Sequence, residues 1–219
     1  MTGESFSPIG GPDDPFEGRF DGGGWVIEGV ELDTPLAENV GLFGRIDSGG
    51  VILNVHIQGA NITGENMIGI LAGQNDGTIE YSSTDGEVGG DGNFAGGLVG
   101  RLSDHGSISN SYSMAAVEGN EHIGGLVGHA EVETTILHSY SISIVTGEEH
   151  LGTLIGSGSG DVRNSYWNEE TNGTMGSAGG TPLTSDQFEN EASFVDWDFD
   201  EVWEMSDTEK RPILQSEPH

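Results

Sequence analysis

Residues 123–128 read Ile-Gly-Gly-Leu-Val-Gly, and residues 95–100 carry nearly the same string, Ala-Gly-Gly-Leu-Val-Gly. Three looser copies, each with apolar residues between glycines, occur at residues 40–44, 68–73 and 151–156. The glycines that close the five copies are 29, 27, 28 and 28 residues apart: Gly44, Gly73, Gly100, Gly128 and Gly156. A motif that recurs at a nearly constant interval indicates a repeat protein, here with a period of about 28 residues.

A second apolar position keeps the same period. It lies six to eight residues after each closing glycine, at Ile52, Ile79, Ile108, Ile136 and Val162. Three of these segments continue as Asn-Ser-Tyr or His-Ser-Tyr, at residues 110–112, 138–140 and 164–166. A third, weaker track consists of single β-branched residues before a glycine turn: Ile62, Val88, Val117 and Val145. The apolar residues alternate with polar ones and do not follow a period of 3.6, which is typical of strands.

Three short strands in each period, joined by turns rich in glycine and polar residues, predict an all-β fold, a parallel β-solenoid (β-helix). We expect about six coils, with equivalent residues of successive coils about 4.8 Å apart. One column inside the tube would consist of leucines: Leu42, Leu71, Leu98, Leu126 and Leu154. Glycines would recur where the backbone turns tightly or adopts a positive φ. The alternative is a compact β-sandwich with accidental internal similarity, which the regular spacings disfavour.

The chain is strongly acidic. Its 219 residues include 37 Asp and Glu but only six Lys and Arg, which gives a formal net charge of −31; Cys is absent. Such a charge repels nucleic-acid phosphates and anionic lipids, so we expect neither as a partner. No apolar run is long enough for a membrane-spanning helix. The patterned apolar residues argue against disorder, and a folded protein adapted to molar salt, where charges are screened within about 3 Å, explains the charge better.

The two ends of the chain differ in composition from the repeats. We expect a lead-in or cap over residues 1–22, the solenoid over residues 23–168, and a linker with a small aromatic cap over residues 169–219. The cap would cover the last coil, because the open strand edge of a solenoid otherwise aggregates. Its aromatic residues would be Trp167, Trp197, Phe199 and Trp203. The alternative for the same side chains is an aromatic platform that binds sugars.

These motifs resemble the repeats of GLUG-motif proteins, in which Gly-Leu-aliphatic-Gly is followed by a strand that ends in Asn-Ser-Tyr. Residues 97–100 and 125–128 match this pattern, whereas Ile70 and Thr153 replace the leading glycine in two coils. The resemblance extends to the segments that flank the repeats. It implies a right-handed parallel β-solenoid in an adhesin-like protein that is surface-exposed or secreted, with no catalytic residues. Because such proteins usually carry more chain and an export signal before the first flanking segment, we expect either a fragment or a short stand-alone form, such as a virus-particle component.

Candidate sites for chemistry are few. His122 and His150 occupy the same place in consecutive coils, so stacking would bring their rings close enough to share a metal ion. The same position holds Met67 and Phe94 in earlier coils, which favours a requirement for bulk over a metal site. We therefore expect no cofactor; calcium would suit the many carboxylates, but no loop has a calcium-binding spacing. With 37 acidic residues, a pair of carboxylates spaced for glycoside hydrolysis carries no information, and no other catalytic motif is present.

The sequence predicts a non-enzymatic, surface-exposed structural or adhesive module of a salt-adapted organism. A rigid strand face would bind a cell-surface glycan or protein, and the location would be extracellular or on the cell surface, although no signal peptide is visible in this chain. One alternative is a spike, fibre or decoration protein in the particle of a halophilic virus, which would form a homotrimer. A second alternative is a polysaccharide-degrading enzyme on a β-helix.

The net charge of −31 predicts that the fold depends on salt. When the salt concentration falls to tens of millimolar, screening extends over tens of ångströms and the carboxylates repel one another, so we expect the chain to unfold. Circular dichroism recorded during dialysis from molar to low NaCl would follow the loss of the β signal. A β signal that stays unchanged at low salt would contradict the interpretation of a salt-adapted protein.

Overall fold

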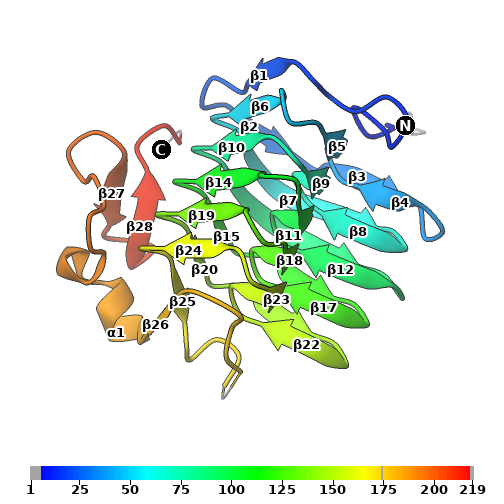
Figure 1. Cartoon of the computed structure of the whole chain (residues 1–219). Helices are drawn as coiled ribbons and strands as arrows, with labels where there is room; N and C mark the ends of the chain where they lie inside the picture. The colour runs from blue at the N-terminus through cyan, green and yellow to red at the C-terminus, as the bar shows by residue number, and fades with distance from the viewer. Residues whose placement is uncertain (1–5, 174, 218–219) are drawn as a thin grey trace.

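The computed structural model describes residues 6–173 and 175–217, so the first five residues of the predicted lead-in lie outside the described part. Parallel strands stack coil upon coil along one axis and form a β-solenoid (Figure 1). Four sheets form the faces of the solenoid, and a separate hairpin lies beside it. The predicted fold class, an all-β parallel solenoid, is therefore confirmed.

Each sheet takes one strand, or one pair of strands, from each coil. Sheet 1 contains β1 (Arg19–Asp21), β6 (Val51–Leu53), β10 (Thr78–Glu80), β14 (Ser107–Ser109), β19 (Thr135–Leu137) and β24 (Asp161–Arg163). Sheet 2 contains β2 (Val26–Glu28), β3 (Glu31–Asp33), β7 (His56–Thr63), β11 (Ser83–Gly89), β15 (Tyr112–Ser113), β16 (Ala116–Glu118), β20 (Tyr140–Ser141), β21 (Ile144–Thr146), β25 (Tyr166–Asn168) and β26 (Thr181–Leu183). Sheet 3 contains β4 (Glu38–Val40), β8 (Asn66–Gly69), β12 (Asn93–Gly96), β17 (Glu121–Gly124) and β22 (Glu149–Gly152). Sheet 4 contains β5 (Phe43–Ile46), β9 (Ala72–Asn75), β13 (Val99–Leu102), β18 (Val127–Ala130) and β23 (Ile155–Gly158).

The register of the sheets keeps equivalent residues directly above one another. In sheet 1, Ile108 pairs with Ile79 on one side and with Ile136 on the other, and all three side chains are buried. The five leucines of the predicted column are buried as well. Sheets 3 and 4 have five layers each, so the described residues form five complete coils, and β24 and β25 begin a sixth that strands do not complete. The expectation of about six coils is therefore slightly high.

The Gly-Gly-Leu-Val-Gly motif forms a corner between two strands, where the sequence predicted one strand. β17 ends at Gly124 and β18 begins at Val127, so each coil has four faces and not three. The backbone of Gly124 is not left-handed; instead, a Cβ atom there would lie 1.9 Å from the carbonyl oxygen of Val127. A glycine recurs at this place in every coil, as Gly41, Gly69, Gly96, Gly124 and Gly152. Close approach of backbone, and not positive φ, explains these glycines.

Positive φ recurs from coil to coil at two columns of residues that are not glycine. One column has φ between 46° and 51° and turns the chain from sheet 1 into sheet 2: Asn54, Tyr81, Asn110, His138 and Asn164. The other has φ between 53° and 66° and lies in the strands of sheet 3: Asn39, Met67, Phe94, His122 and His150. A left-handed backbone costs a side-chain-bearing residue about 1 kcal/mol, and Asn tolerates it best. The asparagine of Asn-Ser-Tyr is thus a corner residue.

The serine of the same motif forms a hydrogen-bonded ladder through the interior. The hydroxyl of Ser111 accepts from the backbone N–H of Ser82 at 3.1 Å and donates to the carbonyl of Ser109 at 2.8 Å. In turn, the N–H of Ser111 donates to the hydroxyl of Ser139 at 3.2 Å, and the N–H of Ser139 donates to the hydroxyl of Ser165 at 3.2 Å. Because each hydroxyl satisfies a buried N–H group of the neighbouring coil, the ladder removes unpaired donors at the corner between sheets 1 and 2.

Both ends of the solenoid are covered by chain outside the repeats. At the first coil, Ile9 and Phe16 form β-bridges with Phe43 and Ile46. At the last coil, the link after β25 completes the hydrogen bonds: Asn172 accepts from the N–H of Val145 at 3.0 Å, and the hydroxyl of Ser177 accepts from the N–H of Ile155 at 2.9 Å. This Gly- and Ser-rich link lies over the last coil, and of the four predicted cap residues Trp167 packs on the solenoid core there, whereas the other three lie in a separate cluster.

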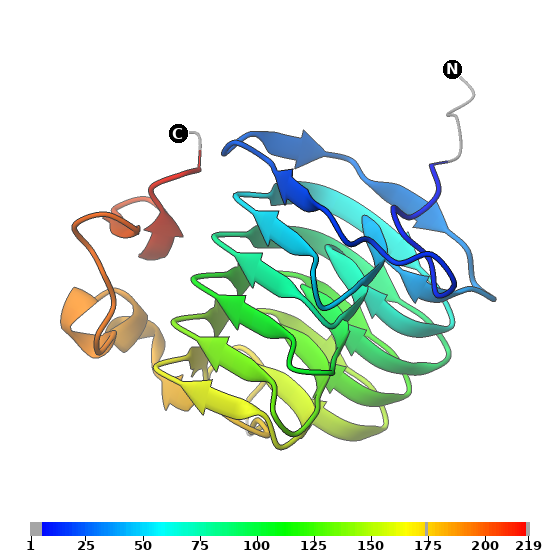
Figure 2. The same cartoon turned by 45° about the horizontal axis from the view of Figure 1, so that its top comes forward.

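The aromatic segment lies along the flank of the solenoid. We call residues 184–217 the strap; it comprises α1 (Ser185–Phe188), a 3₁₀ turn (Glu191–Ser193), and the hairpin of β27 (Trp203–Ser206) with β28 (Arg211–Leu214). The strap runs back from the last coil toward the first, where the C-terminal segment ends beside the early coils (Figure 2). It packs on an outward ladder of tyrosines in sheet 2: Tyr112, Tyr140 and Tyr166.

Substitution of Gly124 by Ala tests the corner. A methyl group 1.9 Å from the Val127 carbonyl oxygen must displace backbone, so we expect the free energy of unfolding to fall by about 1–3 kcal/mol. Gly89→Ala is the matched control, since Gly89 also lies in a strand but a Cβ atom there has open space. Denaturant unfolding in molar NaCl measures both variants. Equal stability of the two variants would show that close approach does not explain the recurring glycine.

Candidate functional sites

The left-handed column of sheet 3 brings three aromatic rings into a stack on the outside of the solenoid. The ring centroids of Phe94 and His122 are 4.9 Å apart, and those of His122 and His150 are 4.5 Å apart, with nearly parallel planes. The sequence predicted that His122 and His150 lie at the same place in successive coils, and the pairing of β17 with β22 places them so. Met67 and Phe94 occupy this column in earlier coils, so both histidines are the last members of a bulky series.

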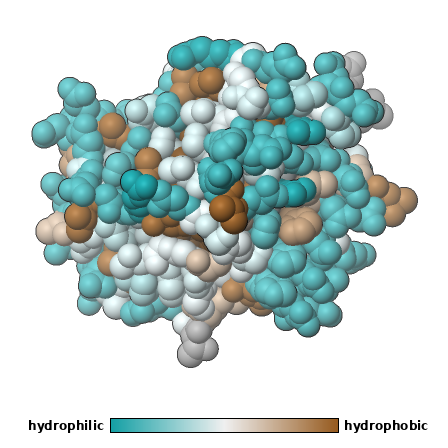
Figure 3. Space-filling model, in the orientation of Figure 1, coloured by the Kyte–Doolittle hydropathy of each residue, from teal (hydrophilic) through white to brown (hydrophobic). Residues whose placement is uncertain are grey.

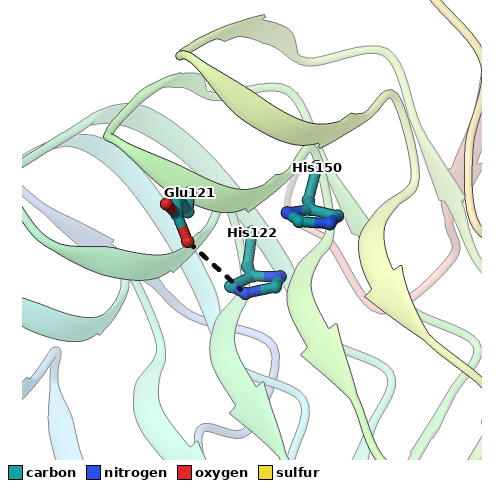
Figure 4. Close-up of side chains that lie close together, drawn as sticks. All are labelled: Glu121, His122 and His150. Atoms are coloured by element: carbon teal, nitrogen blue, oxygen red, sulfur yellow. Dashed lines mark ion pairs between the residues drawn. The ribbon is translucent and has the colours of Figure 1, made fainter.

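Glu121 joins the two histidines. Its Oε2 atom lies 4.0 Å from Nε2 of His122, as the dashed line in Figure 4 marks. One ligand atom from each of Glu121, His122 and His150 lies within 4.8 Å of the others. His122 and Glu121 are partly buried and His150 is exposed, so solvent reaches the cluster.

Ser157 orients the inner side of this cluster. Its hydroxyl is 2.7 Å from Nδ1 of His122 and 2.7 Å from Nδ1 of His129, which lies on the adjoining strand of sheet 4. Burial lowers the pKa of His122, and the neighbouring His150 lowers it further. Burial likewise lowers the pKa of His129. At neutral pH both imidazoles are therefore neutral, with Nδ1 held by the serine and Nε2 left for another partner.

An open strand face forms a second candidate site. It is the outer surface of β7, β11, β16 and β21, where a groove of about 390 Å³ crosses successive coils. A smaller groove of about 230 Å³ continues it and shares Thr63, Gly89 and Glu118. None of the residues that line the larger groove belongs to the strap. The exposed side chains of this face are polar except for Ala116 and Ile144, and they include Asn61, Glu87, Glu118 and Thr146.

The rest of the surface offers little apolar area for docking. In the view of Figure 3, hydrophilic and intermediate residues cover most of the molecule, and the hydrophobic ones form small scattered groups. The large apolar side chains exposed among the described residues are distributed in the same way: Phe6, Trp25, Leu36, Val132, Ile144 and Val195. This pattern is consistent with the strongly acidic composition.

A buried polar group lies where the strap meets the early coils. Nδ1 of His56 is 2.9 Å from the hydroxyl of Ser83 and 3.6 Å from Oε1 of Glu217, and Nε2 of His56 is 3.3 Å from the hydroxyl of Ser216. Burial lowers the pKa of His56 to about 4, and burial raises the pKa of Glu217. The group combines residue types found in hydrolases, but a histidine with so low a pKa is a weak general base at neutral pH.

The predicted aromatic residues separate into two groups. Trp167 belongs to β25 and packs in the core of the solenoid. Trp197, Phe199 and Trp203 belong to the strap, where Trp197 and Trp203 are buried against the tyrosine ladder. Buried rings cannot stack on sugars, so the structure contradicts the alternative of an aromatic sugar platform for these two tryptophans.

Sequence reasoning missed the tyrosine ladder as a docking surface. The hydroxyl of Tyr112 donates to Glu217 at 2.8 Å, and that of Tyr140 donates to the carbonyl of Pro212 at 2.7 Å. The guanidinium of Arg211 donates to the Tyr140 hydroxyl at 2.7 Å and lies 4.9 Å from the centroid of the Tyr112 ring. The signal was present: tyrosines recur on an outward position of the repeat, and the tail is rich in aromatic residues that need a partner.

Comparison with known proteins finds curated relatives for parts of the chain. No family model matches the chain. A segment of 101 residues, 45% of the chain, is 42% identical to halomucin of Haloquadratum walsbyi and spans 1% of that protein. A segment of 86 residues, 38% of the chain, is 36% identical to a protein of Evansella cellulosilytica, provisionally described as a Gly-rich membrane protein, and spans 10% of it. The chain thus spans only a small part of the curated relatives that it matches.

One solved structure supports the fold. The chain is similar to a provisionally described immunoglobulin A1 protease from Bacteroides ovatus, with a TM-score of 0.65 over 91% of this chain and 77% of that one. At 22% sequence identity, the similarity concerns the fold alone. Within residues 6–173 and 175–217, no helix is long and apolar enough to cross a membrane.

The low pKa of His56 makes a testable contribution to pH dependence. Unfolding returns the pKa from about 4 to about 6.5, so the unfolded chain binds the proton more tightly and stability is lost as the pH falls through this window. Between pH 7.5 and pH 5 this effect of His56 lowers the free energy of unfolding by about 2 kcal/mol.

Comparison of the protein with a His56→Gln variant isolates this effect, because Gln keeps a donor for Ser83 but does not titrate. Neutralisation of carboxylates, including Glu217, with its raised pKa, acts in the opposite direction and is common to both chains. Denaturant unfolding in molar NaCl measures both proteins at pH 7.5 and pH 5. The free energy of unfolding should fall more in the unsubstituted protein than in the variant when the pH is lowered. The same pH dependence in both chains would contradict a neutral buried histidine.

Proposed function

We propose that the chain is a non-enzymatic structural and adhesive module of an extracellular surface protein from a salt-adapted organism. The observation that carries this proposal is the match of 42% identity to halomucin, together with five stacked coils whose exposed surface is polar and acidic. A solenoid of this kind is a rigid spacer, because each coil is hydrogen-bonded to the next along its length. We also propose that its repeats are of the GLUG type, on the strength of residues 97–100 and 125–128.

The open strand face is the surface that we propose for binding. It offers amide, hydroxyl and carboxylate groups at intervals of one strand spacing, about 4.8 Å, which suits hydrogen bonding to successive hydroxyl groups of a polysaccharide. Glu87 and Glu118 on this face, and the net charge of −31, disfavour an acidic glycan. We therefore propose an uncharged polysaccharide of the cell envelope as the ligand class.

The group of His56, Ser83 and Glu217 does not favour an enzyme. His56 is 1% exposed, and its Nδ1 atom faces both the Ser83 hydroxyl and the Glu217 carboxylate, so no relay runs from carboxylate through imidazole to nucleophile. An extracellular module without catalysis is the simpler proposal for this chain.

Replacement of Ala116 by Arg tests the proposed face. Ala116 is exposed in the groove, so a long side chain there should block a bound polysaccharide and lower its affinity at least tenfold. Val132→Arg is the matched control, because Val132 is exposed in a turn outside the groove. Binding of a panel of uncharged and acidic polysaccharides to the immobilised chain in molar NaCl measures the effect.

Two outcomes would contradict the proposed function. Equal binding by the Ala116→Arg variant would exclude the open face as the binding surface. Shortening of any polysaccharide chain during incubation would indicate a polysaccharide-degrading enzyme instead.

A further inference from the structure

We propose that Glu121, His122 and His150 bind one divalent transition-metal ion of the zinc class, which links β17 to β22. The proposal is independent of the glycan face, which lies on sheet 2, whereas the cluster lies on sheet 3. It rests on the ligand atoms that the repeat brings within 4.8 Å of one another.

The residue types suit this class of ion. Two imidazoles and a carboxylate are ligands that zinc and its neighbours in the first transition row accept, with water in the remaining position. Calcium and magnesium prefer oxygen ligands, so imidazoles select against them. Further carboxylates directly before His150 in the chain, those of Glu148 and Glu149, add negative potential that attracts a cation.

Binding requires a small movement of one side chain. In a tetrahedral zinc site, two ligand nitrogens lie about 3.4 Å apart. Here the ligand atoms lie within 4.8 Å of one another, and the centroids of the two stacked rings are 4.5 Å apart. His150 is exposed, so its ring can rotate toward the ion at little energetic cost. His122 stays in place because its Nδ1 atom is 2.7 Å from the Ser157 hydroxyl. A hydrogen bond from the second ring nitrogen is the usual support for a metal-bound histidine.

The sequence of the column limits the site to one pair of coils. Phe94 stacks on the other face of His122, and Met67 precedes it, so no imidazole continues the column toward the first coil. We therefore expect a single equivalent of zinc per chain, and we expect it to stabilise the junction of the last two complete coils.

Equilibrium dialysis against Zn²⁺ tests the proposal directly. The folded protein is held at pH 7.5 in molar NaCl with excess Mg²⁺, which occupies carboxylates that lack an imidazole partner. We expect one bound zinc per chain in the unsubstituted protein. We expect at least a tenfold loss of affinity in two variants, His150→Gln and His122→Phe, the second of which introduces the residue found at this left-handed position in the preceding coil. His138→Gln is the matched control, since His138 lies in the other left-handed column, outside the cluster.

Thermal unfolding with and without Zn²⁺ gives a second readout. At a free zinc concentration one hundred times the dissociation constant, the folding equilibrium constant should rise about one hundredfold in the unsubstituted protein and in His138→Gln, but not in the other two variants. Failure of the unsubstituted protein to bind zinc under these conditions would overturn the proposal. Undiminished binding by both cluster variants would also overturn it.

Discussion

The corner between sheets 3 and 4 determines the shape of every coil. At Gly124 a carbonyl oxygen lies where a side chain would begin, and the same contact recurs at Gly96 and Gly152. Because the chain turns this sharply without a left-handed residue, two strands of about four residues can follow each other directly, and the leucine next to the corner points into the tube. The tight corner therefore makes possible both the four-faced cross-section and the narrow apolar core.

The sequence predicts the stacking well, because stacking follows from periodicity. Residues one period apart must occupy equivalent places, so the alignment of Ile79, Ile108 and Ile136 could be read before any coordinates. The cross-section could not be read in the same way, since the left-handed residues include Tyr81 and Met67, which have no special preference for that conformation. Stacking on neighbouring coils imposes the backbone there and overrides local propensity.

The recurring tyrosines marked the surface that the strap covers, but the individual contacts of the strap lay beyond sequence reasoning for a different reason. Its contacts join residues that are far apart in the chain, such as Tyr112 and Glu217, and no local pattern specifies them. The histidine cluster shows the reverse case. Both histidines stand at one place in the repeat, so their proximity was predictable, whereas the support from Ser157 depends on the neighbouring sheet and was not.

The length of the strap also limits the number of coils in the solenoid. The strap leaves the last coil after β26 and reaches the second, where Ser216 lies within 3.3 Å of His56. Most repeat arrays can gain or lose a unit with little penalty, because each unit contacts only its neighbours. Here one additional coil would lengthen the stack by about 4.8 Å. The strap, which begins after β26, would then no longer bring Ser216 to His56. The number of coils is thus tied to the length of a segment outside the repeats, and evolution could change one only together with the other.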